Sequence, residues 1–304
     1  MPYPDDPALR RATVNLLGSV WPRLPGCIEQ ASAWGADWFQ LSTPFVHQVA
    51  DQPVAHVGVL ELPVVIAGRE RLVAAIHAVC TLAGHRGRGY LRQTLERTLA
   101  WVETRYEAAL LWANDPAIYT RFGFVPCAES IFQGPAQGPA PAPAPAPAGR
   151  SATGGAGGPA LRTLSLGCAQ DVRLLRSRLA ARAPVSSRCG TREPGQLALI
   201  DLALWSPPRP AIVLIAALDC IVIYEVEDRT LWLYDVIAPR MPPLAELTAA
   251  LGEPLDRVAV CFSPEELAAP ELAPAPTPLT DFLMVRGTLL AGAEPLAFSP
   301  LTRC

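Results

Sequence analysis

The stretch Ile76–Leu99 most constrains how this chain can fold, because an apolar run there leads into a basic, glycine-rich turn and then a helical pattern. Ile76–Cys80 has the composition of a strand, Arg86–Gly89 (R-G-R-G) forms the turn, and leucines recur at helical spacing from Leu91 onward. The first backbone N–H groups of a helix have no partner within it, and glycine lets a ligand approach them. Two arginines add positive charge that suits phosphate. The stretch therefore predicts a pyrophosphate site, with no catalytic group in the loop itself.

The motif in this turn distinguishes between several possible kinds of site. Glycines and arginines by themselves could also form a plain loop before a basic helix end. The nucleotide-binding motifs G-x-x-x-x-G-K-[ST] and G-x-G-x-x-G are absent. What is present, from Arg86 to Leu91, is R-x-x-G-x followed by leucine where glycine or alanine is usual. This resembles the acetyl-coenzyme A signature of the GNAT N-acetyltransferase superfamily. The R-G-R-G-Y-L-R form is closer to its enhanced-intracellular-survival branch, in which leucine is common at that position.

A second segment supports the resemblance. After the strand-like run 108–113, the spacing N-x-x-A-x-Y-x-x-x-G-F begins at Asn114 and ends at Phe124. This spacing is similar to the GNAT segment that follows the fifth strand of that fold. Two matching segments in the right order are more specific than either alone. The resemblance covers about residues 40–133, and more loosely the first 40.

Composition narrows the class of protein. The 304 residues, half of them hydrophobic, allow one large domain or two of ordinary size. A net charge of −3 implies no broad basic surface for nucleic acid. The eight cysteines form no C-x-x-C or zinc pattern, which favours buried free thiols in a reducing compartment. With no signal-peptide pattern and no membrane-spanning apolar run, we expect a soluble, cytoplasmic bacterial protein without a metal; an oligomer is possible.

The N-terminal part predicts two helices followed by three strands. The pair Asp5-Asp6 with Pro7 is typical of a helix start, and no strand precedes it, although the GNAT resemblance implies one. We expect helices at about 7–20, 25–36 and 90–105, and strands at 45–50, 54–66, 72–81 and 108–113. The aromatic group of Trp34, Trp38 and Phe39 leaves two positions open, the core or the rim of an acceptor pocket.

The second half repeats this order after a segment rich in Pro, Ala and Gly. That segment, 134–160, has the composition of a linker, extended in its Pro-Ala part and flexible in its Gly-rich part. We expect helices at 169–183 and 243–251, and strands at 197–204, 211–217, 220–227, 230–237, 258–262 and 282–286. The predicted fold class is α/β with a mixed sheet, as the GNAT acyltransferase fold. It comprises two tandem GNAT-like domains: a catalytic acetyl-CoA-binding domain at 1–133, the linker at 134–160, and a degenerate domain at 161–304.

The second half should bind no coenzyme A. Where the first half has its glycine-rich turn, the second has Ala238–Pro243 (A-P-R-M-P-P), which contains no glycine. Proline lacks an N–H, so this turn cannot hold a pyrophosphate in the same way. We expect this half to pack on the first and to help shape the acceptor site.

The GNAT resemblance implies where acetyl-coenzyme A binds. The pyrophosphate would sit on the turn, and the pantetheine arm would run beside the strand that precedes it. Tyr119 corresponds to the family tyrosine that protonates the coenzyme A sulfur, and its phenol pKa of about 10 suits a thiol. The predicted cofactor-binding residues are Val79, Cys80, Thr81, Arg86, Gly87, Arg88, Gly89, Tyr90, Leu91 and Asn114.

The general base stays open between three side chains: His77, Glu61 and Glu29. The carboxylate of Cys304 is a further candidate, because the chain terminus reaches the active site in the enhanced-intracellular-survival branch. Cys80 as an acetyl-carrying nucleophile is disfavoured, because an apolar strand raises the pKa of a thiol. The sequence thus predicts direct acetyl transfer to an amine, in a small molecule rather than a protein. The alternative is a non-catalytic acyl-CoA sensor on a GNAT scaffold.

Overall fold

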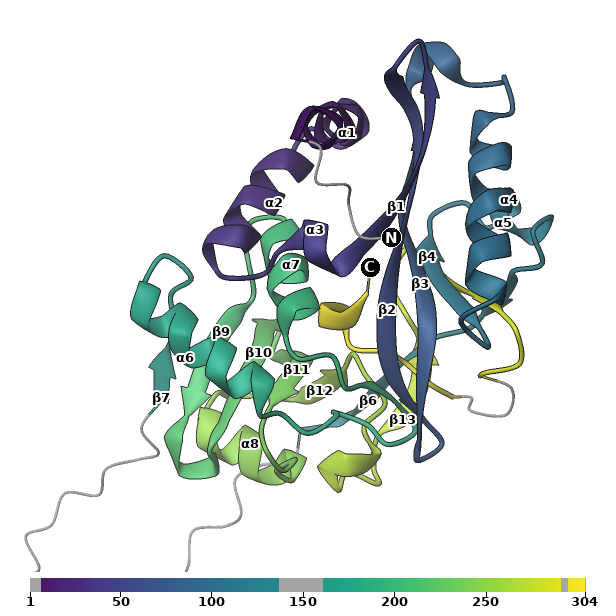
Figure 1. Ribbon diagram of the computed structural model, residues 1–304. Helices are drawn as coiled ribbons and strands as arrows, with labels where there is room; N and C mark the ends of the chain where they lie inside the picture. Colours follow the sequence, from purple (N-terminus) through teal and green to yellow (C-terminus); the bar gives the residue numbers. More distant parts are fainter. Residues whose placement is uncertain (1–6, 137–160, 291–294, 304) are drawn as a thin grey trace, which may run out of the picture.

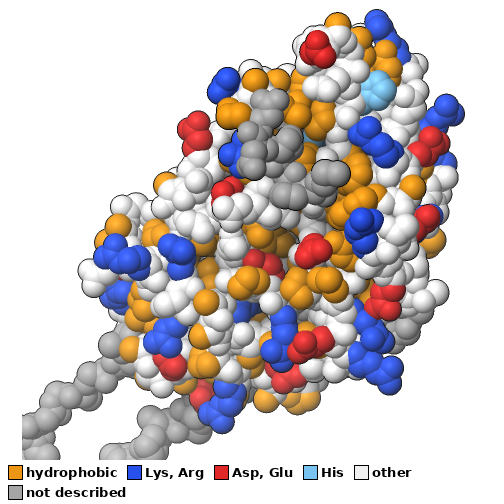
Figure 2. Space-filling view, in the orientation of Figure 1, with side chains coloured by type: hydrophobic (Ala, Val, Ile, Leu, Met, Phe, Trp, Pro, Cys, Tyr) orange, Lys and Arg blue, Asp and Glu red, His pale blue; other side chains and the backbone are white. Residues whose placement is uncertain are grey.

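The computed structural model describes residues 7–136, 161–290 and 295–303 (Figure 1). Two seven-stranded mixed sheets lie beside each other, with helices packed on their faces. The predicted α/β class with mixed sheets is confirmed. No helix within the described ranges is long and apolar enough to cross a membrane. On the face shown in Figure 2, arginine and carboxylate side chains are interspersed rather than gathered by sign.

The first sheet is built mainly from the N-terminal half. Its strand order is β1-β2-β3-β4-β14-β5, and β8 pairs with β2 beside this path. The strands are β1 (Ser42–Val49), β2 (Gln52–Ile66), β3 (Arg69–Thr81), β4 (Ala109–Ala113), β5 (Val125–Cys127), β8 (Cys189–Thr191) and β14 (Phe282–Arg286). The three predicted strands before the glycine-rich turn are therefore confirmed as an antiparallel meander.

Helices cover both faces of this sheet. The helix α4 (Tyr90–Glu103) packs Leu95, Leu99 and Val102 on one face, as its apolar spacing predicts. On the other side lie α1 (Pro7–Val20), α2 (Leu24–Ala33) and α3 (Trp38–Leu41), as Figure 1 shows. The helix α1 begins at Pro7 as predicted, and its proposed cap residues Asp5 and Asp6 lie outside the described residues.

The second sheet has the order β13-β6-β12-β11-β10-β9-β7. Its strands are β6 (Ser130–Pro135), β7 (Leu161–Thr163), β9 (Ala211–Ile215), β10 (Cys220–Glu227), β11 (Thr230–Ile237), β12 (Arg257–Val260) and β13 (Ala273–Pro276). The helices of this half are α6 (Ala169–Ala180), α7 (Gln196–Leu204) and α8 (Leu244–Leu251), and α5 (Ala117–Thr120) follows β4 in the first half.

One element was predicted wrongly. The run 197–204, expected to be a strand, is the helix α7. All residues from Leu197 to Ala203 are buried, so the helix is apolar on every side and shows no amphipathic period in the sequence. Such a run can be either a buried strand or a buried helix.

The two halves of the chain exchange strands. The segment 282–286 is a strand as predicted, but β14 lies between β4 and β5 in the first sheet. Conversely, β6, whose last two residues fall within the predicted linker 134–160, pairs with β12 and β13 in the second sheet. Each half therefore completes the sheet of the other. Residues 134 and 135 of the predicted linker thus belong to a strand. A linker over 137–160 stays a prediction, since these residues lie outside the described part.

Candidate active site

The first sheet opens between β3 and β4. These parallel strands pair only at Ala74–Ala109 and Ala75–Leu110, and they diverge beyond that point. Among the described strands, the end of β3 therefore pairs with β2 on one side and with none on the other. An unpaired strand edge offers N–H and C=O groups that can bind an extended ligand.

A bulge fixes the direction of this edge. Ala78 has a φ of 49°, and the β2–β3 register shifts between His56 and Gly58. His56 Nδ1 lies 2.8 Å from the carbonyl oxygen of Ala78. Burial lowers the pKa of His56 to about 4, so the ring is neutral at pH 7, and a carbonyl acceptor assigns the proton to Nδ1. A neutral histidine thus holds the bulge in place.

Backbone groups of Val79 and Thr81 face the opening. The Leu82 N–H donates to Val54 O at 2.8 Å, which directs Leu82 toward β2. Alternate residues of a strand direct their backbone groups to opposite edges, so Thr81 and Val79 point away from β2. In agreement, Thr81 O accepts a bond from Arg86 Nε at 3.2 Å.

The glycine-rich turn leaves the start of α4 uncapped. Gly87 and Gly89 have φ values of 74° and 81°, which favour glycine. A Cβ on either would meet nothing within 4 Å, so backbone conformation rather than crowding requires glycine here. Gly89 is the N-cap residue and makes no side-chain bond to the helix. The first N–H groups of α4 are therefore available to an anion.

A cleft of about 710 Å³ runs from this turn along the free edge of β3. Eight predicted cofactor-binding residues line it: Val79, Cys80, Thr81, Arg86, Gly87, Gly89, Tyr90 and Leu91. Arg92 and Arg121 add positive charge, whereas Arg88 is exposed and does not line the cleft. Thr81 Oγ1 and His85 Nδ1 are buried there without a partner among the described residues. Because buried polar atoms are normally bonded, these two fit a cleft that takes a polar ligand.

Tyr119 lies buried on α5, with its ring edge on Phe124 at 6.1 Å between centroids. Burial raises its pKa to about 12, and the nearby carboxylate of Asp115 adds to the rise. The phenol is therefore protonated at neutral pH and can act as a proton donor.

Asn114 and Cys80 are both engaged within the protein. Asn114 Nδ2 donates to Asp281 Oδ1 at 2.7 Å, so this side chain is tied to the segment that precedes β14. Burial raises the pKa of Cys80 to about 12, which leaves a thiol rather than a thiolate at neutral pH. Direct transfer suits such a thiol better than an acyl-cysteine intermediate does.

The three predicted bases lie apart. His77 Nε2 lies 2.8 Å from Ser42 Oγ, and burial and the charge of His56 lower its pKa to about 3, so it accepts a proton poorly. Glu61 accepts a bond from Tyr106 Oη at 2.6 Å on the α4 face of the sheet. Glu29 is exposed on α2. Each remains a prediction. Cys304 lies outside the described residues.

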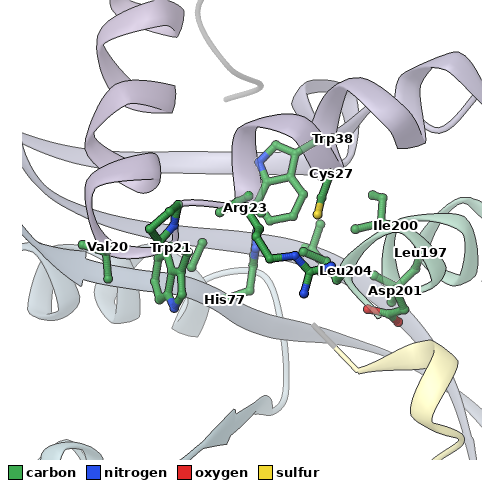
Figure 3. Close-up of a pocket in the computed structure, with 14 residues that line it drawn as sticks. Val20, Trp21, Arg23, Cys27, Trp38, His77, Leu197, Ile200, Asp201 and Leu204 are labelled. Carbon is green, nitrogen blue, oxygen red and sulfur yellow. The ribbon is translucent and has the colours of Figure 1, made fainter. Parts of the chain in front are cut away.

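A second cavity, of about 410 Å³, adjoins the other face of β3 (Figure 3). Trp38 and His77 lie on one side of it, and α7 contributes Leu197, Ile200, Asp201 and Leu204 on the other. Trp38 is buried, as expected of a core residue, and it also lines this cavity.

Asp201 is the residue of this cavity that sequence reasoning missed. Residues 197, 200, 201 and 204 follow the i, i+3, i+4, i+7 spacing of one helix face. Had the run been recognised as a helix, a carboxylate within an apolar face would have indicated a site. Because the run was predicted as a strand, these four residues were not expected on one face.

Comparison with known proteins agrees with this geometry. Residues 21–127 match the family model described as an acetyltransferase (GNAT) domain. The chain is similar to Eis1 from Mycobacterium abscessus at 19% identity and a TM-score of 0.56, covering 93% of this chain and 72% of that one. It is also similar to a GCN5-related N-acetyltransferase from Anabaena variabilis at 14% identity and a TM-score of 0.55, covering 92% and 70%. A search of curated proteins finds no match.

Proposed function

We propose that this protein, whose residues 21–127 match the family model of an acetyltransferase (GNAT) domain, transfers an acetyl group from acetyl-coenzyme A directly to an amine. The observation that carries the proposal is the cleft that joins the free edge of β3 to the uncapped start of α4. The acceptor amine belongs to a small molecule rather than a protein. The protein works in the cytoplasm, needs no metal, and has no membrane or nucleic-acid partner.

The cleft can hold the parts of acetyl-coenzyme A in order. The pyrophosphate binds the first N–H groups of α4, with Arg86 and Arg92 beside it. The pantetheine arm extends along β3 and pairs with the outward backbone groups of Val79 and Thr81. Thr81 Oγ1 and His85 Nδ1, which have no hydrogen-bond partner in the described part of the chain, bond polar atoms of acetyl-coenzyme A.

The chemistry then needs few groups. The Val79 N–H lies on the free edge and polarises the thioester carbonyl, which stabilises the oxyanion of the tetrahedral intermediate. The amine nitrogen bonds to the carbonyl carbon, and the carbon–sulfur bond breaks as the intermediate collapses. Tyr119 gives its proton to the departing sulfur. The amine must lose a proton before or during attack, and the three predicted bases are poorly placed for this step.

Calorimetric titration with acetyl-coenzyme A tests the proposal. We expect one site per chain, because the turn Ala238–Pro243 of the second half has no glycine. The double variant Arg86→Ala, Arg92→Ala should bind at least about tenfold more weakly, since each charge-assisted bond to phosphate contributes about 1.5–3 kcal/mol. Arg173→Ala, on α6 and outside the cleft, is the matched control and should bind normally. Absence of binding by the unaltered protein would refute the assignment.

A further inference from the structure

The apolar cavity meets the cofactor cleft along β3. His77 and Ala78 line the cavity, whereas Val79, Cys80 and Thr81 line the cleft. Val20, at the end of α1, lines both. An acetyl group held at the free edge of β3 would therefore lie next to whatever occupies the cavity.

The mostly apolar lining of the cavity favours ligands that have an apolar part. Leu24, Cys27, Leu60, Ile200 and Leu204 are among its walls, and α2, β2 and α7 supply them. Binding pockets of this size take small molecules whose apolar part fills the space, while a few polar groups fix the orientation. A polycation would lose its hydration against these walls without compensation.

Asp201 supplies the acidic group of this lining. Asp201 is 9% exposed, and its Oδ2 atom is buried with no hydrogen-bond partner among the described residues. The backbone N–H of Arg303 donates a hydrogen bond to the Asp201 carboxyl group, and the positive charge of Arg303 favours its ionised form. The guanidinium itself is paired with another residue, because Arg303 Nη2 lies 3.1 Å from Glu129 Oε1. A buried acceptor without a partner is costly, so Asp201 is suited to a ligand that brings a donor.

We propose that this cavity is the acceptor site, that its substrate is a primary amine carried on an apolar body, and that Asp201 binds the amine nitrogen and accepts its proton. The inference rests on the proposed acetyl transfer and names its substrate class and its missing base. The apolar body fills the space between Trp38 and α7. The nitrogen donates to Oδ2, which has no hydrogen-bond partner among the described residues.

The proton balance follows from burial. An ammonium ion and the Asp201 carboxylate would form an ion pair inside an apolar cavity, where two separated charges are poorly solvated. Transfer of one proton from nitrogen to the carboxylate gives a neutral amine and a neutral carboxyl, with no charge left to solvate. The neutral amine has the lone pair that attacks the thioester. The proton taken by Asp201 is released to water after the amide departs. The nitrogen loses its second proton as the intermediate collapses, and this proton restores the Tyr119 phenol, which has given its own proton to the sulfur.

The pH dependence has a definite sign. Burial raises the pKa of Asp201 well above its ordinary value, Glu193 adds to the rise, and Arg303 opposes it. Arg23 and His77 also line the cavity, and His77 stays neutral because burial lowers its pKa to about 3. Productive binding needs the Asp201 carboxylate with the ammonium form of the substrate. The kcat/KM should therefore increase as the pH rises through the Asp201 pKa.

The test measures coenzyme A release with matched amines. The probes are 2-phenylethylamine and n-hexylamine, with spermidine as the polycation and 2-phenylethanol as the neutral analogue that cannot be N-acetylated. We expect turnover with the first two and a lower kcat/KM with spermidine. Asp201→Asn should lower kcat about 10²-fold or more and remove the acidic limb of the kcat/KM profile. Asp219→Asn, an exposed aspartate of the second half, is the matched control and should change neither.

A second variant tests the cavity without the carboxyl. Leu204 is 37% exposed at the end of α7, so Leu204→Trp should narrow the cavity and raise KM for 2-phenylethylamine while leaving the affinity for acetyl-coenzyme A unchanged. If acetyl-coenzyme A binds but neither apolar amine is acetylated, or if Asp201→Asn retains the wild-type profile, this inference is wrong while the cofactor assignment survives. If acetyl-coenzyme A does not bind, the proposed function itself fails.

Discussion

At the scale of single residues, neutral buried groups set up the opening of the sheet. His56 holds the bulge at Ala78, and the ring of His77 lies between Ser42 and Trp38, with its centroid 4.8 Å from the Trp38 ring. Motif spacing predicted the glycines and Tyr119 because such features are local in the sequence. The role of His56 depends on Ala78 in another strand, which its sequence neighbours do not indicate. That of Asp201 depends on whether the run 197–204 is a helix or a strand, which the pattern of the run does not decide.

Tyr119→Phe separates an enzyme from a sensor. The variant keeps the ring that packs on Phe124 but loses the proton that the phenol holds at neutral pH. We expect acetyl-coenzyme A affinity to be retained and kcat to fall about 10²-fold or more, the size of a general acid contribution. Calorimetry and coenzyme A release measure the two quantities. Unchanged turnover would mean that another group protonates the sulfur.

Gly58→Ala tests how tightly His77 is held. A Cβ at this position would lie 2.4 Å from His77 Nε2, and the ring is fixed by Ser42 and Trp38. We expect the free energy of unfolding to fall by about 1–3 kcal/mol, as for other overpacked cores. Adding His77→Ala should cost less in the Gly58→Ala background than in the wild type, because the clash is gone. Additive losses in urea unfolding would contradict the contact.

The acid behaviour of the two buried histidines is a third prediction at this scale. Burial lowers the pKa of His56 to about 4 and that of His77 to about 3, against about 6.5 in an unfolded chain. The folded form therefore binds fewer protons than the unfolded one below pH 6.5, and these residues contribute stability that is lost as the pH falls. The nitrogen NMR chemical shifts of both rings should keep the values of a neutral imidazole down to about pH 5. Protonation near pH 6.5 in the folded protein would contradict their burial.

At the scale of elements, local pattern decides what the sequence can predict. The unit β3–turn–α4 follows from an apolar run, two glycines and a clear helical period, and its bounds agree with the structure. The helix α7 has no such period because it is buried all round, so its pattern does not distinguish a helix from a strand. The helix start of α4 depends on the conformation of Gly89, whereas α7 depends on the packing around it.

Gly89→Ala should weaken cofactor binding through the start of α4. Gly89 has a φ of 81° and is the N-cap, and a left-handed conformation costs a residue with a side chain about 1–2 kcal/mol. We expect a loss of affinity for acetyl-coenzyme A of about tenfold, because a shifted first turn misdirects its N–H groups. Gly84→Ala is the matched control, since a Cβ there meets nothing and its φ is not positive. Equal affinity in both variants, measured by calorimetry, would contradict the role of Gly89.

At the scale of the whole molecule, the site is assembled from both halves. The acceptor cavity needs α2 and β3 from the first half and α7 from the second. The strand β14 was predicted with correct bounds, but its place between β4 and β5 could not be, because strand pairing over such a separation leaves no local trace. The division into domains at 1–133 and 161–304 stays a prediction about folding units, and the exchanged strands make it testable.

Expressing the halves separately tests that division. Residues 1–148 alone would leave β4 and β5 without β14, whose Leu283, Met284 and Val285 are buried. An uncovered apolar strand edge promotes aggregation, so we expect this half to be insoluble or to lack a cooperative thermal transition. Co-expressed with residues 149–304, it should copurify and bind acetyl-coenzyme A, because the cut lies outside every described element. Met284→Asp in the second half should abolish copurification, whereas Asp219→Asn should not. A first half that unfolds cooperatively by itself would show instead that β14 is an addition to an independent domain.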